Sequence, residues 1–118
     1  MKKVKIEPKE LNGEISIPPS KSISHRAVIA ASLSSGVSEI SNIVMSKDIK
    51  ATCEAMKQLG AEISEVKAEN EKVKLIIKGI EVFKAPQAPI DCNESGSTLR
   101  FMIPIAMMSN SEIRFIEK

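Results

Sequence analysis

The chain has 118 residues, of which 42% are apolar, 27% charged and 3% aromatic, and its formal net charge is +2. This length suits one modest folded domain, and so small a net charge does not by itself indicate a polyanionic partner. The absence of Trp and Tyr argues against a module that stacks nucleic-acid bases on aromatic rings. We therefore expect a core of Ile, Val, Leu, Met and Ala and no nucleic-acid partner.

Cysteine usage and hydropathy limit the protein class further. Cys53 and Cys92 lie far apart without Cys-x-x-Cys spacing, so we expect two reduced structural thiols in a cytoplasmic protein. One His and two Cys cannot supply a convincing zinc site, and we expect no metal. No apolar run approaches the roughly 18 residues of a membrane span, and the first residues lack the apolar segment of a signal peptide. We expect no membrane partner.

The first twenty residues contain two alternating segments, Val4–Ile6 and Ile15–Ile17, with Asn12-Gly13 between them. Asn-Gly flanked by alternating residues predicts a β-hairpin. Two prolines, Pro18 and Pro19, should end the second strand, because proline cannot donate to a sheet ladder.

A helix is predicted from the Ser20 cap to about Leu33, with Gly36 as a left-handed terminator. Its buried face is expected to contain Ile23, Ala27, Ala30 and Ala31. The first turn carries cations and hydroxyls but no carboxylate, although the helix dipole favours acidic residues there. Such a turn either belongs to an unfavourably charged surface helix or binds a phosphate or carboxylate group.

The residue pattern in the middle of the chain predicts one further helix and three strands. A strand over Val37–Val44 precedes a helix that begins at Ser46 or Asp48 and ends at Gly60. The apolar stripe of that helix contains Ile49, Cys53, Met56 and Leu59. Two strands follow at Glu62–Lys67 and Val73–Lys78, and the second should bury Val73, Leu75 and Ile77 on one face.

A third helix is predicted from about Ser95 to Met108, followed by a strand-like segment, Glu112–Ile116. Pro104 cannot donate to the carbonyl of Arg100, so a kink or an early end is expected. The methionines are interpreted as core filler, namely Met56, Met102, Met107 and Met108.

Two motifs resemble those of a known family. The pattern K-S-x-S-x-R-A at 21–27 and N-E-S-G-S-T-L-R at Asn93–Arg100 resemble the 5-enolpyruvylshikimate-3-phosphate (EPSP) synthases, enolpyruvyl transferases of chorismate biosynthesis. The second motif departs from the family's common N-A-G-T, and Phe101 stands where proline is common. The two motifs are separated and correctly ordered, which makes the resemblance specific. It covers the whole chain, but the chain would be only about a quarter of such an enzyme.

The resemblance implies an α+β fold built from βαβαββ units with helices inside and sheets outside. Arg26 and Arg100 are 74 positions apart (100 minus 26), and both follow Ser-rich helix starts, which also indicates a repeated unit. We expect three parts. Residues 1–20 would be strands and a crossover that belong to the other domain, 21–94 would form one unit, and 95–118 would begin a second. Without that domain, the N-terminal strands are expected either to fray or to pair differently.

The resemblance implies transfer of the enolpyruvyl group of phosphoenolpyruvate to the 5-hydroxyl of shikimate 3-phosphate, without a cofactor. Lys21 would contact both substrates, Ser22 and Arg26 would bind shikimate 3-phosphate, and Gly96 would contact phosphoenolpyruvate, with Arg100 as a further candidate. The acid–base residues would lie in the rest of the enzyme. The chain alone would contain no catalytic residue, would be inactive, and would associate with the rest of its own chain or with itself.

Three other titratable residues are given structural interpretations. His25 is interpreted as a surface donor rather than a general base, although its pKa can lie near 7. Asp48 is interpreted as a cap and Asp91 as a turn residue.

Two alternatives remain. The related UDP-N-acetylglucosamine enolpyruvyl transferases typically have K-N-A where this chain has Lys21-Ser22-Ile23. A non-catalytic anion-binding or RNA-binding module would show a steep salt dependence of RNA binding.

Overall fold

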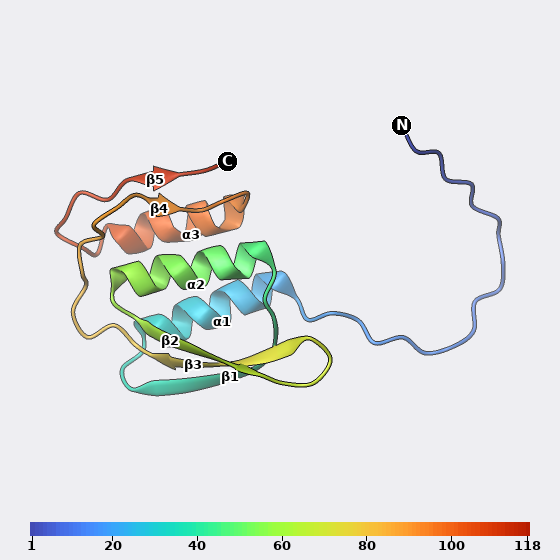
Figure 1. Ribbon diagram of the computed structural model, residues 1–118, viewed down its shortest axis with the longest axis horizontal. Coiled ribbons are helices and arrows are strands. Elements are labelled where there is room, and N and C mark those ends of the chain that lie inside the picture. Colours follow the sequence, from blue (N-terminus) through green and yellow to red (C-terminus); the bar gives the residue numbers. More distant parts are fainter.

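The computed structural model describes all 118 residues and contains three helices and five strands (Figure 1). In chain order the elements are α1 (Lys21–Leu33), β1 (Val37–Val44), α2 (Lys47–Leu59), β2 (Glu62–Lys67), β3 (Lys72–Lys78), β4 (Ile90–Asp91), α3 (Gly96–Ala106) and β5 (Phe115–Ile116). The α+β class is confirmed, and the order of elements from Lys21 to Lys78 agrees with the predicted unit except for its leading strand.

The main sheet has the strand order β1-β3-β2, and both pairings are antiparallel. The register between β1 and β3 shifts between Ile40 and Ile43, where Asn42 adopts a φ of 64°. This β-bulge explains the imperfect alternation of β1 in the sequence. The short strands β4 and β5 form a separate parallel pair, joined through α3.

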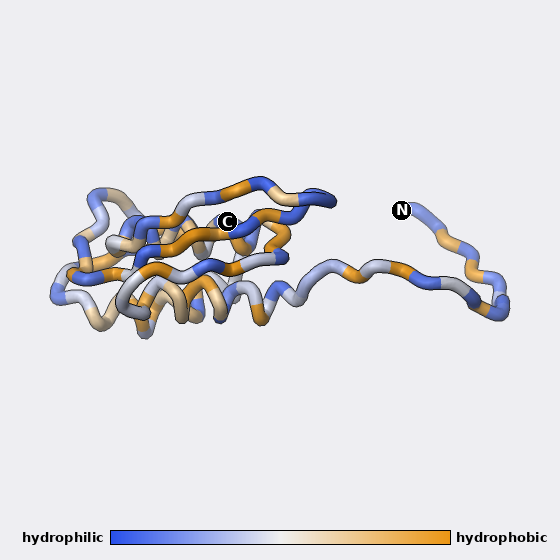
Figure 2. Tube along the Cα trace, turned by 90° about the horizontal axis from the view of Figure 1, so that it is seen from below, coloured by the Kyte–Doolittle hydropathy of each residue, from blue (hydrophilic) through white to orange (hydrophobic).

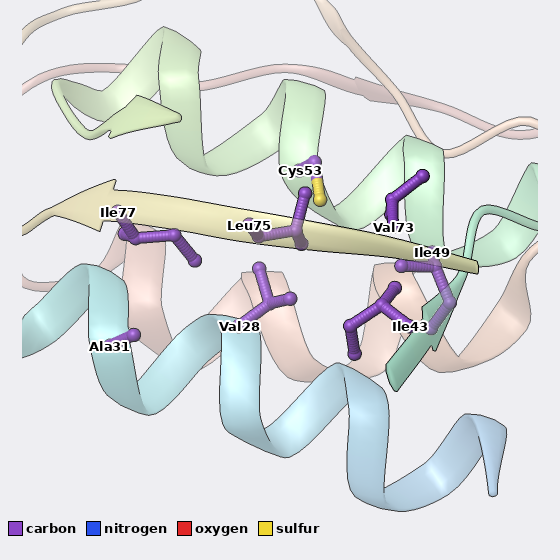
Figure 3. Packing of buried hydrophobic residues seen from close by; sticks show 8 residues of the cluster. All are labelled: Val28, Ala31, Ile43, Ile49, Cys53, Val73, Leu75 and Ile77. Atoms are coloured by element: carbon purple, nitrogen blue, oxygen red, sulfur yellow. The ribbon is translucent and has the colours of Figure 1, made fainter. Parts of the chain in front are cut away.

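The core lies between this sheet and the helices α1 and α2 (Figure 3). Alternate residues of β3 point into it, and the helix stripes supply the rest: Val28, Ala31, Ile43, Ile49, Cys53, Val73, Leu75 and Ile77. A second cluster joins the end of α2 to β4 and α3 through Met56, Leu59, Ile90 and Met102. The buried stripes predicted for α2 and β3 are confirmed, since all seven of their residues are buried.

The hairpin predicted for residues 4–17 does not form, whereas the alternative expectation of frayed N-terminal strands agrees with the structure. Residues 1–20 contain no strand and extend away from the folded part (Figures 1 and 2). Their apolar side chains are exposed, including Val4, Ile6, Ile15 and Ile17. An isolated two-stranded hairpin is marginal in water, and these strands have no core to cover.

The buried face predicted for α1 is also partly wrong. Ile23 is 69% exposed and Ala30 is exposed, while the residues that pack inward are Ser24, His25, Val28, Ala31 and Ser32. Hydroxyls are tolerated there because Ser24 Oγ donates to Ser20 O at 2.8 Å and Ser32 Oγ donates to Val28 O at 2.7 Å. These bonds within the helix satisfy both hydroxyls, so Ser24 and Ser32 can be buried without a partner on another element.

Helix α3 ends at Ala106, two residues after Pro104, so the early end is confirmed. The methionines divide into two groups. Met56 and Met102 are fully buried, whereas Met107 and Met108 are 80% and 62% exposed, so the core role predicted for that pair is wrong in this chain. Together with Ile103 they leave an apolar surface on α3 exposed.

The helix boundaries follow local rules that the sequence contains. Ser20 and Ser46 cap α1 and α2, and each hydroxyl accepts a hydrogen bond from the backbone three residues later. Gly60 closes α2 with a φ of 121°, a conformation that favours glycine. No helix has the length and apolar character needed to cross a membrane.

Candidate functional site

Three helix starts lie at the same side of the molecule. Helices α1, α2 and α3 lie side by side and begin at the same end (Figure 1), with α2 contacting both of the others. Each start has a serine cap, at Ser20, Ser46 and Ser95. Because parallel helix dipoles place their positive ends together, this end of the layer favours bound anions.

The start of α1 presents the side chains expected for an anion site. Lys21, Ser22 and Arg26 are all exposed, and the first turn contains no acidic residue. Arg26 Nη1 donates to Ser22 Oγ and, at 3.2 Å, to the Ser22 carbonyl oxygen. Ser22 and Arg26 therefore share a face of α1, as residues four positions apart on a helix do. Because Ser20 is the cap, the Ser22 hydroxyl is not needed for that role.

The start of α2 adds a carboxylate beside this group. Lys21 Nζ lies 3.5 Å from Asp48 Oδ2, and Asp48 belongs to the first turn of α2. The capping serine of that helix is Ser46, so Asp48 acts as a dipole partner and as an ion-pair partner for Lys21 rather than as the cap.

The start of α3 contributes a glycine and an aromatic ring. Gly96 is the first residue of α3, and a Cβ added there would meet only Glu117 Oε1, at 3.6 Å, so the backbone is open to a ligand. The guanidinium carbon of Arg26 lies 5.5 Å from the centre of the Phe101 ring, a cation–π contact that holds Arg26 toward α3. Arg100 is exposed and makes no salt bridge.

His25 does not lie on the surface, which corrects the sequence interpretation. Its side chain is 2% exposed, and Nδ1 lies 2.8 Å from Thr52 Oγ1 of α2. Burial lowers the pKa of His25 below its ordinary value, with the charges of Lys21 and Arg26 acting in the same direction and Asp48 opposing them. The imidazole is therefore held neutral, and it has no path to an external substrate.

The remaining candidates have structural roles. Asp91 Oδ1 accepts a hydrogen bond from Asn93 N at 2.8 Å, which confirms the turn interpretation. Cys53 and Cys92 are free and buried. Burial raises the pKa of the Cys53 thiol to about 11 and also raises the pKa of Cys92, so neither is an activated nucleophile.

Sequence reasoning missed the buried threonines between the helices. Thr52 and Thr98 are both fully buried, and their hydroxyl oxygens lie 2.8 Å apart. The signal for Thr52 is its position between Ile49 and Met56, three and four residues away, on the apolar stripe of α2. A polar residue there must find a partner. No comparable local signal in the sequence indicates that His25 contacts Thr52.

Comparisons with known proteins identify close relatives. Residues 6–116 match the family model described as EPSP synthase (3-phosphoshikimate 1-carboxyvinyltransferase). The chain is 53% identical to the 3-phosphoshikimate 1-carboxyvinyltransferase of Clostridium novyi (strain NT) and 55% identical to that of Clostridium perfringens (strain SM101 / Type A). Each alignment covers 98% of this chain but only 27% and 26% of the respective relative. The chain thus spans about a quarter of the length of these relatives.

Solved structures show the same fold. A structure of the EPSP synthase from Acinetobacter baumannii matches 90% of this chain and 23% of its own, with a TM-score of 0.65 and 24% identity. A second structure of that enzyme matches 76% of this chain and 20% of its own, with a TM-score of 0.61 and 26% identity.

Proposed function

Because this chain belongs to the EPSP synthase family, we propose that it supplies the N-terminal part of an enzyme that transfers the enolpyruvyl group of phosphoenolpyruvate to the 5-hydroxyl of shikimate 3-phosphate. The observation that carries this proposal is the shared end of three helices, where exposed Lys21, Ser22 and Arg26 lie without an acidic residue in their own turn. Both proposed substrates carry phosphate groups, and phosphoenolpyruvate also carries a carboxylate.

The roles of the individual residues follow from their chemistry. The ammonium of Lys21 can neutralise a phosphate or carboxylate group as a point charge, whereas Arg26 can offer paired N–H donors to the oxygens of shikimate 3-phosphate. Ser22 adds a hydroxyl beside Arg26. The open backbone at Gly96 gives phosphoenolpyruvate access to the amides of the α3 start, and exposed Arg100 is a further candidate for its contact.

This surface is suited to binding rather than to chemistry. Two carboxylates lie beside it: Asp48 is paired with Lys21, and Glu117 Oε1 lies 3.6 Å from where a Cβ on Gly96 would stand. The histidine beside it, His25, is buried and neutral. The transfer adds the 5-hydroxyl to C2 of phosphoenolpyruvate while C3 takes a proton, and then eliminates phosphate while C3 loses a proton. We propose that the groups that move these protons lie in the rest of the enzyme, and that residues 1–20 pair with that part. The boundaries of the three predicted parts of the chain, after residue 20 and after residue 94, stay predictions. The cytoplasmic location also stays a prediction.

Phosphate binding by this chain tests the proposal. In a titration of the ¹⁵N-labelled chain with inorganic phosphate, phosphoenolpyruvate or shikimate 3-phosphate, the amides of residues 22–24 should shift, with dissociation constants on the order of millimolar, near −4 kcal/mol. Lys21→Ala should abolish these shifts. Lys84→Ala removes one exposed lysine beside Gly60, at the far end of α2, and should leave them unchanged.

Two results would contradict the proposal. One is a set of shifts confined to other parts of the chain. The other is an equal loss of binding in Lys21→Ala and Lys84→Ala, because that would indicate a general response to net charge.

A further inference from the structure

A chain of buried side-chain hydrogen bonds crosses the layer of helices close to their starts. His25 Nδ1 lies 2.8 Å from Thr52 Oγ1, Thr52 Oγ1 lies 2.8 Å from Thr98 Oγ1, and Thr98 Oγ1 lies 2.7 Å from Ser95 Oγ. All four residues are at most 2% exposed. The contacts join α1, α2 and α3 across 27 and 46 positions of sequence, so the chain is a tertiary feature.

Both ends of this hydrogen-bond chain lie next to residues of the proposed anion site. His25 directly precedes Arg26, and Ser95 directly precedes Gly96 and caps α3 by accepting from Thr98 N at 3.1 Å. Thr98 Oγ1 also lies 3.3 Å from the backbone carbonyl oxygen of Asp48, at the start of α2. The four side chains therefore connect all three helix starts through directional bonds, which add a fixed geometry to the apolar packing between the helices.

Counting protons shows that these bonds act together. Each hydroxyl has one proton, so Thr98 can donate to only one of Thr52, Ser95 and the Asp48 carbonyl at a time. If Thr52 donates to His25 Nδ1, then Thr98 donates to Thr52 and Ser95 donates to Thr98, and the longer contact with the Asp48 carbonyl is left without a proton. If Nδ1 instead carries a proton, these three bonds can reverse together, and Ser95 then accepts from Thr98 and has its own proton available next to Gly96. The state of the ring on α1 is thereby linked to the donor pattern at the start of α3.

We propose that Thr52 and Thr98 are positioning residues for anion binding, because their hydroxyls hold the starts of α1 and α3 in one register so that Arg26 and Gly96 border the same anion site. This inference rests on the proposed function and adds the device that assembles the site. Neither threonine touches the ligand. Their effect passes through His25 on one side and Ser95 on the other.

Replacing Thr52 tests the proposal, because Thr52→Val keeps the shape and removes the hydroxyl. The phosphate affinity of the ¹⁵N-labelled chain should fall about fivefold or more, a typical size for coupling between sites. Thr52→Ser restores a hydroxyl and should recover most of the affinity. As a control, Ser32→Ala removes a buried hydroxyl on α1 that bonds only to Val28 O. This variant should leave the phosphate affinity unchanged even if stability falls.

The wild type supplies a second readout that does not depend on the folding of any variant. Phosphate should move the amides of residues 95–97 and the ring nitrogens of His25 with the same midpoint as the amides of residues 22–24. The groups that face His25 are Lys21 and Arg26 on α1, Asp48 on α2 and the uncharged ring of Phe101 on α3. The titration is therefore run at constant pH, and Lys21→Ala, which should abolish phosphate binding, should also abolish the shift of the His25 ring.

The outcomes separate this proposal from the proposed function. Phosphate binding that is equal in the wild type and in Thr52→Val overturns the positioning role alone. The positioning role is also overturned if phosphate shifts the amides of residues 22–24 but moves neither the amides of residues 95–97 nor the ring nitrogens of His25. If the wild type shows no phosphate shift at all, the anion site itself is wrong and the positioning role falls with it.

Discussion

Lys21 Nζ and Asp48 Oδ2 lie 3.5 Å apart, and this ion pair joins the first turns of two neighbouring helices. Both side chains are partly exposed, at 64% and 34%, so the pair contributes little to stability. Its importance lies in competition, because an anion that binds Lys21 must share it with the carboxylate already present.

Removing that carboxylate should strengthen anion binding. Asp48→Asn keeps the size of the side chain, and we expect the phosphate affinity to rise several-fold at low salt, with the gain shrinking as salt screens the site. Glu54→Gln makes the same charge change elsewhere on α2, where Glu54 pairs with Lys57 at 2.9 Å, and should have a smaller effect. NMR titration with phosphate measures both variants. Equal gains in the two would show that only net charge matters.

The same substitution should act on His25. Asp48 raises the pKa of this imidazole against the larger effect of burial, so Asp48→Asn should lower the pKa further. The ring ¹⁵N shifts followed against pH report this value. An increase in the pKa would contradict the assigned contribution of Asp48.

Burial of neutral His25 should make the fold sensitive to mild acid. Because the pKa is lowered in the folded state, the unfolded chain binds the proton first as the pH falls. The free energy of unfolding should keep the full contribution of His25 above the ordinary pKa of 6.5 and lose it as the pH drops below that value. Urea unfolding of the wild type and of His25→Asn at about pH 7.5 and about pH 5.5 measures this, with the wild type losing more. Equal losses would show that other groups dominate.

Replacement by alanine should affect stability at one glycine and phosphate binding at another. A Cβ at Gly79 would collide with the backbone carbonyl oxygen of Ser34, where the chain leaving β3 crosses the end of α1. Gly79→Ala should therefore cost about 1–3 kcal/mol or more of stability. Gly96→Ala meets only Glu117 Oε1 at 3.6 Å and should leave stability nearly unchanged while weakening phosphate binding at the α3 start. Denaturant unfolding compares them, and similar stability losses would contradict the packing at Gly79.

The exposed apolar surface of α3 should make this chain self-associate. Ile103 on α3 and Met107 and Met108 directly after it form this surface, and β5, which pairs only with β4, leaves a further strand edge unpaired. Sedimentation velocity over a range of concentrations should show a concentration-dependent increase in mass. Met107→Lys combined with Ile103→Lys should reduce the increase, whereas Val82→Lys, at a separate exposed position, should not. A strictly monomeric profile at every concentration would contradict the prediction.

The 118-residue chain alone should not transfer the enolpyruvyl group. Orienting two substrates is worth roughly 7–11 kcal/mol, and the helix starts described here provide only part of the contacts. An assay for phosphate release from phosphoenolpyruvate and shikimate 3-phosphate should give no signal above background. Release that is sensitive to Lys21→Ala would reveal acid–base chemistry within these residues.

Local signals in the sequence determined most of the elements. Serine caps and terminating glycines are short-range features, so the bounds of α1 and α2 could be predicted closely. Periodicity identified the buried stripes of α2 and β3, because large apolar residues recur there on one face. The grouping of Lys21, Ser22 and Arg26 was likewise readable, since residues within one or two turns of a helix stay neighbours in any tertiary context.

Tertiary structure alone decided which face of α1 is buried and what completes the site. Ile23 looked like a core residue, yet it is 69% exposed, and the face of α1 that contains His25 and Val28 is the one that packs inward. The strands predicted before Pro18 did not form because no sheet in this chain accepts them. The partners Asp48 and Thr52 lie on another helix, 27 positions from Lys21 and His25 respectively, and Thr98 lies 46 positions beyond Thr52. Contacts at such distances depend on how helices pack, and no local pattern of side chains specifies that.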